Sequence, residues 1–356
     1  MPLFTIGPVE MFPGTLEVRS RQVPYFRNAA FSQVVFESCD MIQKLMGAEE
    51  GARTILLTSS GTGAMEATVM NCLGTDDHAL VINGGSFGAR FCQILERHHV
   101  PFDSVDLASG EALVADRLAP FEGIGLTALL VNLDETSTGQ LYDLEMLSAF
   151  CKRNDMLLIV DAISAFLSDP IDMASAGIDV LIVSSQKALS LAPGLSCVTL
   201  SPRMVERVVS RDACPCMYFD FVDYLRNGER GQTPFTPAVG VVYELHQRLE
   251  TLLSQGGAAA EVERVRGIAL DFRSRLAALP VRLPEYPLSN AVTPVILDDC
   301  DARSLIDGLE SGYGIVINPC GGAHAHDMVR IAHVGNHSTG ENPGLVQAIS
   351  EVLSVS

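Results

Sequence analysis

Short apolar runs alternate along most of the chain with amphipathic stretches. The runs are rich in Ile, Val and Leu, and they occupy residues 54–58, 79–82, 102–105, 128–132, 157–160 and 180–183. Continuous runs of this kind are typical of parallel strands that are covered on both faces. The amphipathic stretches predict helices at residues 31–46, 64–73, 89–98, 112–118 and 144–154. This alternation predicts an α/β fold with a large, mostly parallel mixed sheet covered by helices.

The chain from residue 196 onward follows a different pattern. A run at residues 196–200 comes so soon after the preceding strand that antiparallel pairing is expected. Periodicity fades over residues 204–230, and two long helices are predicted at 239–254 and 261–279. The remainder predicts a small α+β domain with strands at 291–297 and 329–333 and helices at 302–312 and 342–353.

Glycine and proline mark the expected domain limits. The opening GPVEMFPG predicts an extended arm, and QGGAAA interrupts the two long helices. We expect an N-terminal arm over residues 1–20, a large domain over 21–245 and a smaller C-terminal domain over 246–356.

Composition and charge exclude several classes of partner. The 356 residues carry a formal charge of -19, which argues against nucleic acid or an anionic membrane surface as a partner. No apolar run has the roughly 18 to 20 residues of a membrane-spanning helix, and no secretory signal is seen. The nine cysteines are scattered rather than paired, which is typical of a reducing compartment. We therefore expect a cytoplasmic protein.

Two of the predicted strands end in side chains with complementary chemistry. The strand at 157–160 leads into Asp161, and the strand at 180–183 leads through Ser184, Ser185 and Gln186 to Lys187. Parallel strands deliver both ends to one edge of the sheet, where open α/β sheets bind ligands. A carboxylate that keeps a pyridine nitrogen protonated, and a lysine that forms an imine and then moves a proton, are what pyridoxal phosphate requires.

Three further strand ends carry polar or aromatic residues, each with two interpretations. The turn Ser59–Gly63 opens a helix and offers a phosphate seat, although hydroxyl helix caps look the same. Phe87 stands among glycines, where a ring stacks on a cofactor or folds into the core. Thr136 lies in the polar loop 134–139, where its side chain either contacts a cofactor or substrate or only stabilises the turn.

Taken together, these segments resemble a known family. The matching motifs are Gly7-Pro8, SSGTGAMEA (59–67), NGGSFGAR (83–90), VDAIS (160–164), SSQKAL (184–189), Thr236-Pro237 and Val329-Arg330-Ile331 with Gly335 beyond. The chain is similar to class V, fold-type I pyridoxal-phosphate aminotransferases, in the branch of alanine–glyoxylate, serine–pyruvate and 2-aminoethylphosphonate–pyruvate transaminases. The resemblance covers nearly the whole chain.

The resemblance implies a role for each matched position. Lys187 would be the Schiff-base lysine and Asp161 the partner of the pyridine nitrogen. The other cofactor-binding positions would be Ser60, Gly61, Thr62 and Gln186 at the phosphate, Phe87 and Ile163 on the two ring faces, and Thr136. Thr236 matches a residue that reaches the phosphate of the neighbouring subunit, which implies a homodimer with shared active sites. Arg330 would bind the substrate carboxylate, unless it forms an ordinary surface ion pair, and Gly7 lies at a substrate-side position.

Some residues depart from the family pattern. Phe26-Arg27 stands where many relatives have His-Arg, and Phe87 replaces the tryptophan of some relatives. His324 and His326 have no counterpart in the family pattern; two histidines could bind metal, but solvated loop residues are expected instead, so no metal is predicted. Cys214 and Cys216 do not form a zinc-type pair.

The sequence therefore predicts a transaminase that moves an amino group from a small amino acid or aminophosphonate to a 2-oxo acid such as pyruvate or glyoxylate. One alternative is a pyridoxal-phosphate lyase or desulfurase on the same fold, with Cys320 or Cys214 as a sulfur acceptor. Another is a catalytically silent cofactor-binding subunit.

Overall fold

The structure, a computed structural model, describes residues 2–211, 214–298, 300–321 and 324–355. Its larger sheet has seven strands in the order β2-β10-β9-β8-β5-β3-β4. Only β10 runs antiparallel to its neighbours, as its short connection predicts. The strands are β2 (Arg53–Leu57), β3 (Ala79–Asn83), β4 (Phe102–Asp106), β5 (Ala128–Asn132), β8 (Leu157–Asp161), β9 (Val180–Ser184) and β10 (Ser196–Leu200).

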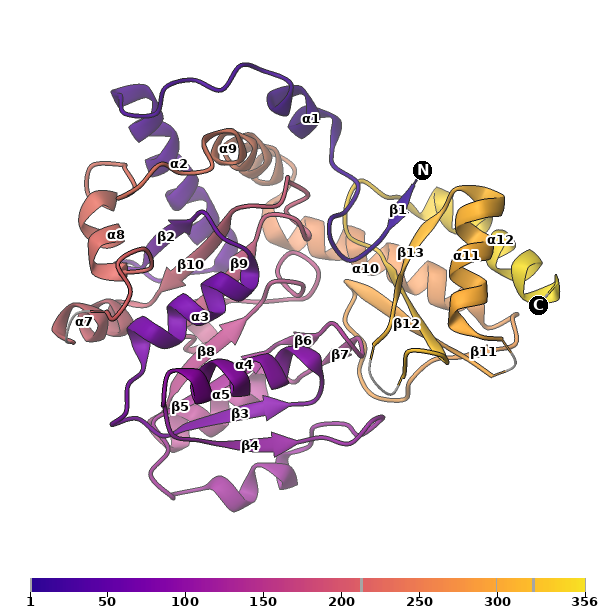
Figure 1. Cartoon of the computed structure of the whole chain (residues 1–356), viewed down its shortest axis with the longest axis horizontal. Helices are drawn as coiled ribbons and strands as arrows, with labels where there is room; N and C mark the ends of the chain where they lie inside the picture. The colour runs from indigo at the N-terminus through magenta and orange to yellow at the C-terminus, as the bar shows by residue number, and fades with distance from the viewer. Residues whose placement is uncertain (1, 212–213, 299, 322–323, 356) are drawn as a thin grey trace.

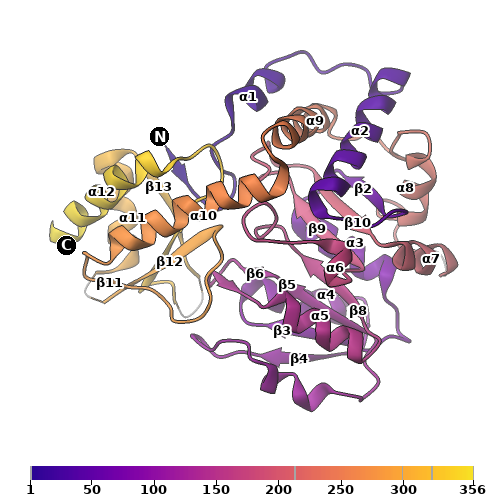
Figure 2. The same ribbon diagram turned by 180° about the vertical axis from the view of Figure 1, so that it is seen from behind.

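Both faces of this sheet are buried under helices, which explains why its strands are apolar without alternation. On β9, Leu181 and Val183 belong to the core on one face, whereas Val180 and Ile182 belong to the core on the other. Figure 1 shows α3 and α4 in front of the sheet, and Figure 2 shows α5 and α6 over its back. The helices around it are α2 (Ala29–Met46), α3 (Gly61–Cys72), α4 (Ser86–Arg97), α5 (Leu144–Arg153), α6 (Met173–Ala176), α7 (Pro202–Ser210), α8 (Phe221–Gly228) and α9 (Val239–Ser254).

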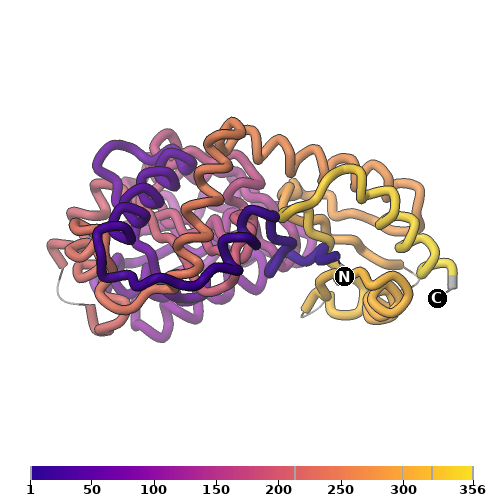
Figure 3. Tube along the Cα trace, turned by 90° about the horizontal axis from the view of Figure 1, so that it is seen from above, coloured from indigo at the N-terminus to yellow at the C-terminus, as the bar shows by residue number. Residues whose placement is uncertain are grey.

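A second, smaller sheet has five strands in the order β1-β13-β14-β12-β11. Both chain ends lie on this side of the molecule (Figure 3), and the N-terminal β1 pairs parallel with β13. Its strands are β1 (Leu3–Phe4), β11 (Val281–Arg282), β12 (Val292–Leu297), β13 (Val316–Pro319) and β14 (Met328–Ala332). The helices packed with it are α10 (Gly257–Leu276), α11 (Ala302–Tyr313) and α12 (Asn342–Val355). Outside these two groups lie α1 (Pro13–Arg19), the hairpin of β6 (Asp134–Glu135) and β7 (Gln140–Leu141), and short 3-10 helices.

Helix α10 connects the two lobes (Figure 2). Its Val265 is part of the large-sheet core, and its Phe272 and Leu276 are part of the small-sheet core. Helix α9, which spans residue 245, packs beside α1 and α2 in the large lobe. The division of the chain at residues 245 and 246 stays a prediction.

The structure confirms the predicted strands and most helices, but it corrects several segments. Helix α1 begins at Pro13, inside the opening stretch that was expected to be extended. Residues 112–118 do not form an α-helix but lead into the short 3-10 turns Ala115–Arg117 and Ala119–Phe121, the second of which contains Pro120. Helices α7 and α8 form where no helix was expected, and each is short and buries only two or three residues. Helix α10 begins at Gly257, four residues before its expected start.

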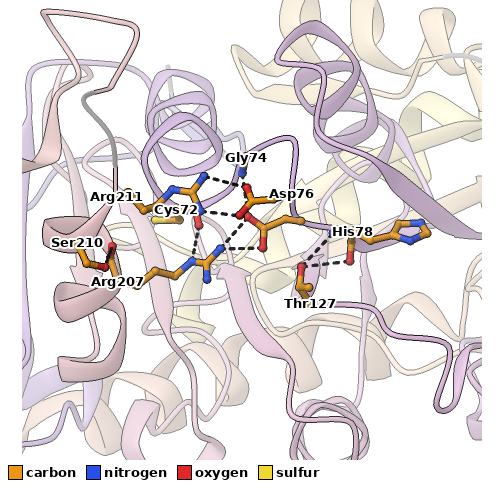
Figure 4. A network of polar contacts seen from close by, with 9 residues as sticks. Cys72, Gly74, Asp76, His78, Thr127, Arg207, Ser210 and Arg211 are labelled. Atoms are coloured by element: carbon orange, nitrogen blue, oxygen red, sulfur yellow. Dashed lines mark hydrogen bonds and ion pairs between the residues drawn. The ribbon is translucent and has the colours of Figure 1, made fainter.

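A polar network fixes α7 to the loop between α3 and β3 (Figure 4). Asp77 is buried, and both its oxygens accept hydrogen bonds from Arg207 at 2.7 Å. Arg207 also donates to the carbonyl oxygen of Cys72 at 2.9 Å, and Arg211 lies 3.3 Å from the Asp77 carboxylate. The network thus compensates the burial of a charged group with several hydrogen bonds. Among the described residues, no helix combines the length and the apolar character that crossing a membrane requires.

Candidate active site

A cavity lies at the edge of the large sheet where β8 and β9 end and α3 and α4 begin. Nine of the twelve residues predicted for the site line it: Ser60, Gly61, Thr62, Phe87, Thr136, Asp161, Ile163, Gln186 and Lys187. Met65, Arg90 and Ser164 complete the lining. The other three predicted residues, Gly7, Thr236 and Arg330, lie outside it.

The acid and the amine in this cavity both have shifted pKa values. Burial raises the pKa of Asp161 to about 6, although its carboxylate accepts hydrogen bonds from the Ile163 backbone N–H at 2.8 Å and from the Asn132 amide. Burial, helped by the positive charge of Arg330, lowers the pKa of Lys187 to about 8, although the nearby carboxyls of Asp134 and Asp161 act in the opposite direction. The neutral, nucleophilic amine is therefore far more populated near neutral pH than it is in an exposed lysine.

The start of α3 forms an anion seat. The Ser60 hydroxyl caps the helix by accepting a hydrogen bond from the Gly63 N–H at 3.3 Å. A β-carbon on Gly61 would come within 2.4 Å of Ile163 Cδ1, so glycine lets the helix start directly against the sheet edge. The first N–H groups of a helix have no intrahelical acceptor, and they carry the positive end of its dipole. This arrangement suits a phosphate group.

A buried carboxylate fixes the start of α4. Glu135 is fully buried, and its carboxylate accepts the backbone N–H of Phe87 at 3.2 Å and of Gly88 at 3.0 Å. The side chain of Ser137 donates to the same carboxylate. These bonds hold Phe87 in the first turn of the helix, with its ring at the cavity wall.

The three residues outside the cavity differ in how near they come to it. Arg330, on β14 of the small sheet, reaches across to donate to the carbonyl oxygen of Thr136 at 2.9 Å. Gly7 lies against the lysine, since a β-carbon there would be 2.8 Å from Lys187 Cδ. Thr236 is exposed in the single chain. The loop before it is held by Arg27, which donates to the carbonyl oxygen of Thr233 at 2.8 Å.

A second buried carboxyl lies near Lys187. Asp134 is 2% exposed, and neither of its oxygens has a hydrogen-bond partner among the described residues. Burial, together with the nearby charge of Asp169, raises the pKa of Asp134 to about 8. The sequence pointed to the loop 134–139 as a whole but gave no separate role to Asp134 or Glu135, and it assigned no role to Asn132, Arg90 or Ser164. The place of the first three at the end of β5 was a usable indication, since every strand end on this edge faces the same ligand site.

The loop residues left open by the sequence lie apart from the cavity lining. His324 contacts Ser109 and Asp327, while His326 is exposed and pairs with Asp301 at 3.4 Å. Within the ranges that the structure describes, no group of three or more metal-ligating side chains is found. Residues 322–323, in the loop before these histidines, lie outside the described residues.

With the geometry defined, comparison with known proteins identifies the family. The sequence profile described as Aminotransferase class-V matches residues 21–339. The chain belongs to this family. This class V aminotransferase is 28% identical over 360 residues to the alanine–glyoxylate aminotransferase of Callithrix jacchus, covering 98% of this chain and 86% of the relative. It is 26% identical over 346 residues to the L-aspartate–glyoxylate aminotransferase of Paracoccus denitrificans, covering 94% and 86%.

Solved structures agree with this assignment. The aspartate aminotransferase of subgroup IV from Thermus thermophilus superimposes with a TM-score of 0.92 at 27% identity, covering 100% of this chain and 99% of that one. The predicted fold class, a fold-type I pyridoxal-phosphate transferase, is confirmed, and so is the prediction of a pyridoxal-phosphate-dependent transaminase.

The residues present fit pyridoxal phosphate. The cavity offers a helix start with two hydroxyl groups, an aromatic ring at its wall, a buried carboxyl and an amine with a lowered pKa. Each of these is a group that the phosphate, the ring, the pyridine nitrogen or the aldehyde of this cofactor requires.

Proposed function

We propose that this transaminase moves an amino group from a small amino acid or aminophosphonate to a 2-oxo acid of the pyruvate or glyoxylate type. The single observation that carries the proposal is the meeting of Lys187 and Asp161 in one cavity, with the Arg330 charge near the amine. Relatives that are named glyoxylate aminotransferases support this choice of acceptor.

Lys187 would hold the cofactor through its aldehyde and later move the proton at the α-carbon of the amino donor. An amine with a pKa of about 8 is neutral in roughly one molecule in ten at pH 7, compared with fewer than about one in a thousand at the ordinary value of 10.5. Burial therefore prepares Lys187 both as a nucleophile and as a base.

Asp161 would hold a proton on the pyridine nitrogen. When bound, pyridoxal phosphate supplies an electron sink that stabilises negative charge at the α-carbon, and it does so best with this nitrogen protonated. The Asn132 amide and the Ile163 N–H orient the carboxyl toward that task.

The other lining residues would bind and orient the cofactor. Phe87 and Ile163 would lie on the two faces of its ring, and Thr136 at its edge. Ser60, Gly61, Thr62 and Gln186 would surround its phosphate, where the start of α3 offers free N–H groups.

Arg330 would bind the acid group of both substrates, and Gly7 would border it in the arm. In the described part of the chain no carboxylate pairs with Arg330, and its hydrogen bonds go to the carbonyl oxygens of Thr136 and Pro319. The remaining N–H groups of its fork can bind a carboxylate or a phosphonate, because both present two oxygens to a bidentate partner.

A homodimer would complete the site. Thr236 is exposed in the single chain and lies beyond the cavity, so it is available to a second copy of the chain. We infer that Thr236 reaches the phosphate bound by the partner subunit, which makes two shared active sites.

Transamination fits the site better than the desulfurase alternative. A sulfur acceptor must be a mobile, accessible thiolate. Cys320 is buried, and burial raises the pKa of its thiol to about 11. Burial also raises the pKa of Cys214.

A half-reaction screen tests the proposal. The purified cofactor-loaded protein is mixed in turn with alanine, serine, aspartate and 2-aminoethylphosphonate, and the loss of its visible absorbance is followed with time. We expect at least one donor to bleach the protein and pyruvate or glyoxylate to restore the colour. Bleaching by none of the four would refute the proposal, and product formation without need of a 2-oxo acid would favour a lyase.

Two variants assign the roles. Lys187→Ala should abolish turnover while the fold is kept. Arg330→Gln should raise KM about 10- to 100-fold, as expected for a lost charge-assisted fork, with a smaller effect on kcat. A KM that stays unchanged in Arg330→Gln would place the substrate acid group elsewhere.

A further inference from the structure

The proposed phosphate seat lacks a cation among its predicted members. Ser60, Gly61, Thr62, Gln186 and Thr236 are all neutral residues. The chain as a whole carries a formal charge of -19, so its general field repels a phosphate dianion. A helix start contributes only about half an elementary charge. A positive side chain in the cavity would therefore add most of the attraction that a phosphate dianion needs there.

Arg90 supplies a positive charge at this place. It lines the same cavity, one helical turn beyond Phe87 on α4. Its Nη1 atom donates to the Thr62 hydroxyl at 3.1 Å, which brings the guanidinium to the first turn of α3.

The guanidinium is held in position by its surroundings. Its central carbon lies 4.8 Å from the centre of the Phe87 ring, within the range of a cation–π contact. Glu135 fixes the backbone of the same helical turn at Phe87 and Gly88 but forms no ion pair with Arg90. Across the described ranges, no carboxylate lies within ion-pair distance of Arg90, and Thr62 is its hydrogen-bond partner.

We propose that Arg90 binds the phosphate group of the cofactor and is the cation of this seat. The inference rests on the proposed placement of the cofactor in this cavity. An arginine fork with free N–H donors, beside the free N–H groups of a helix start, matches the geometry of a phosphate. Through its contact with Phe87, the same side chain would bind the phosphate and support the aromatic ring that lies against the cofactor ring.

The test compares two ligands that differ only in the phosphate. Dissociation constants for pyridoxal phosphate and for pyridoxal are measured by absorbance titration of the full chain freed of cofactor, without any amino donor. We expect Arg90→Gln to weaken binding of pyridoxal phosphate about 10- to 100-fold and to leave binding of pyridoxal within about twofold, as for a lost charged hydrogen bond. Arg90→Lys should recover part of the loss, since it keeps the charge without the fork.

Arg97 provides a matched control. It lies exposed on the same helix, outside the cavity, so Arg97→Gln makes the same change in net charge. Arg97→Gln should leave both dissociation constants unchanged. An equal loss for both variants would mean that only the general charge matters, and it would overturn the proposal.

Two other outcomes would also overturn it. If Arg90→Gln weakens both ligands equally, the residue acts on the ring through Phe87. If neither ligand is affected but KM for acidic donors rises, Arg90 binds the substrate. The proposed function is tested separately, because a protein that binds pyridoxal phosphate through Arg90 but reacts with no donor would refute only the transamination.

Discussion

The buried carboxyl of Asp134 makes a strong prediction about stability and pH. Burial and the charge of Asp169 raise its pKa from the ordinary 3.8 to about 8, against the opposing effects of the Ser164 hydroxyl and of the Lys187 charge. Between these two values the folded protein keeps a proton that the unfolded chain has lost. The contribution of Asp134 to stability is therefore complete below pH 3.8 and is lost as the pH rises toward 8.

The magnitude follows from the number of protons involved. When the folded state binds one more proton than the unfolded chain, the free energy of unfolding falls by about 1.4 kcal/mol for each unit by which the pH rises. Asp134→Asn keeps the size of the side chain and removes the ionisation. From pH 5 to pH 7 the free energy of unfolding of the variant should therefore rise by about 3 kcal/mol relative to the wild type, which is a large fraction of the roughly 5–15 kcal/mol of a typical domain.

The assay is urea unfolding followed by circular dichroism, because the chain has no tryptophan. Wild type and variant are compared at pH 5, 6 and 7, with protomer and cofactor concentrations held constant. Asp116→Asn, at an exposed position, is the matched control, and its stability difference from the wild type should not reproduce the pH trend of Asp134→Asn. A stability difference that stays flat from pH 5 to pH 7 for Asp134→Asn would refute the reasoning, and it would mean that Asp134 is ionised beside the Lys187 ammonium.

Three further substitutions test other parts of the structure. Gly7→Ala would place a methyl group 2.8 Å from Lys187 Cδ in a backbone conformation with φ +155°. Because this would displace the lysine, steady-state kinetics should show turnover reduced at least about tenfold. Asp77→Asn deprives Arg207 of its paired acceptor, so urea unfolding should show a loss of about 2–3 kcal/mol. Glu135→Gln removes the charge that holds the start of α4, and the dissociation constants of pyridoxal phosphate and pyridoxal should rise together, about threefold to tenfold.

Two neighbouring positions serve as controls. Gly14→Ala in the same arm meets only the flexible end of Gln247 and should keep normal turnover. Asp76→Asn should change stability little, because Asp76 is exposed and lies 3.6 Å from Arg211. Loss of activity in Gly14→Ala, or equal destabilisation by Asp76→Asn and Asp77→Asn, would contradict the corresponding argument.

The strand ends could be predicted from the sequence because they depend on local pattern. A strand buried on both faces must be apolar throughout, so Leu157–Asp161 and Val180–Ser184 stand out, and parallel pairing brings their ends to one edge. The turn Ser59–Gly63 was equally visible as the opening of a helix, since a Ser-Gly-Thr turn both caps a helix and binds an anion, although the helix begins at Gly61 rather than at residue 64.

Two segments were misjudged from the sequence, one as irregular and one as a helix. Helix α7 places only Met204 and Val208 in the core, and its position depends on the distant ion pairs of Asp77. The segment 112–118 was predicted to be helical but is not an α-helix, because Pro120 follows it closely and cannot continue a helix.

The amino-acid sequence by itself determined the α/β architecture and placed an acid and an amine at one sheet edge, since both follow from hydrophobic period and strand direction. Only the tertiary structure decided how strongly those groups are shifted in pKa, that Asp134 and Glu135 are buried beside them, and that Arg330 crosses from the second sheet. Burial and contact between segments far apart in the chain set these properties, because desolvation and charge act through space and leave no periodic trace in the sequence.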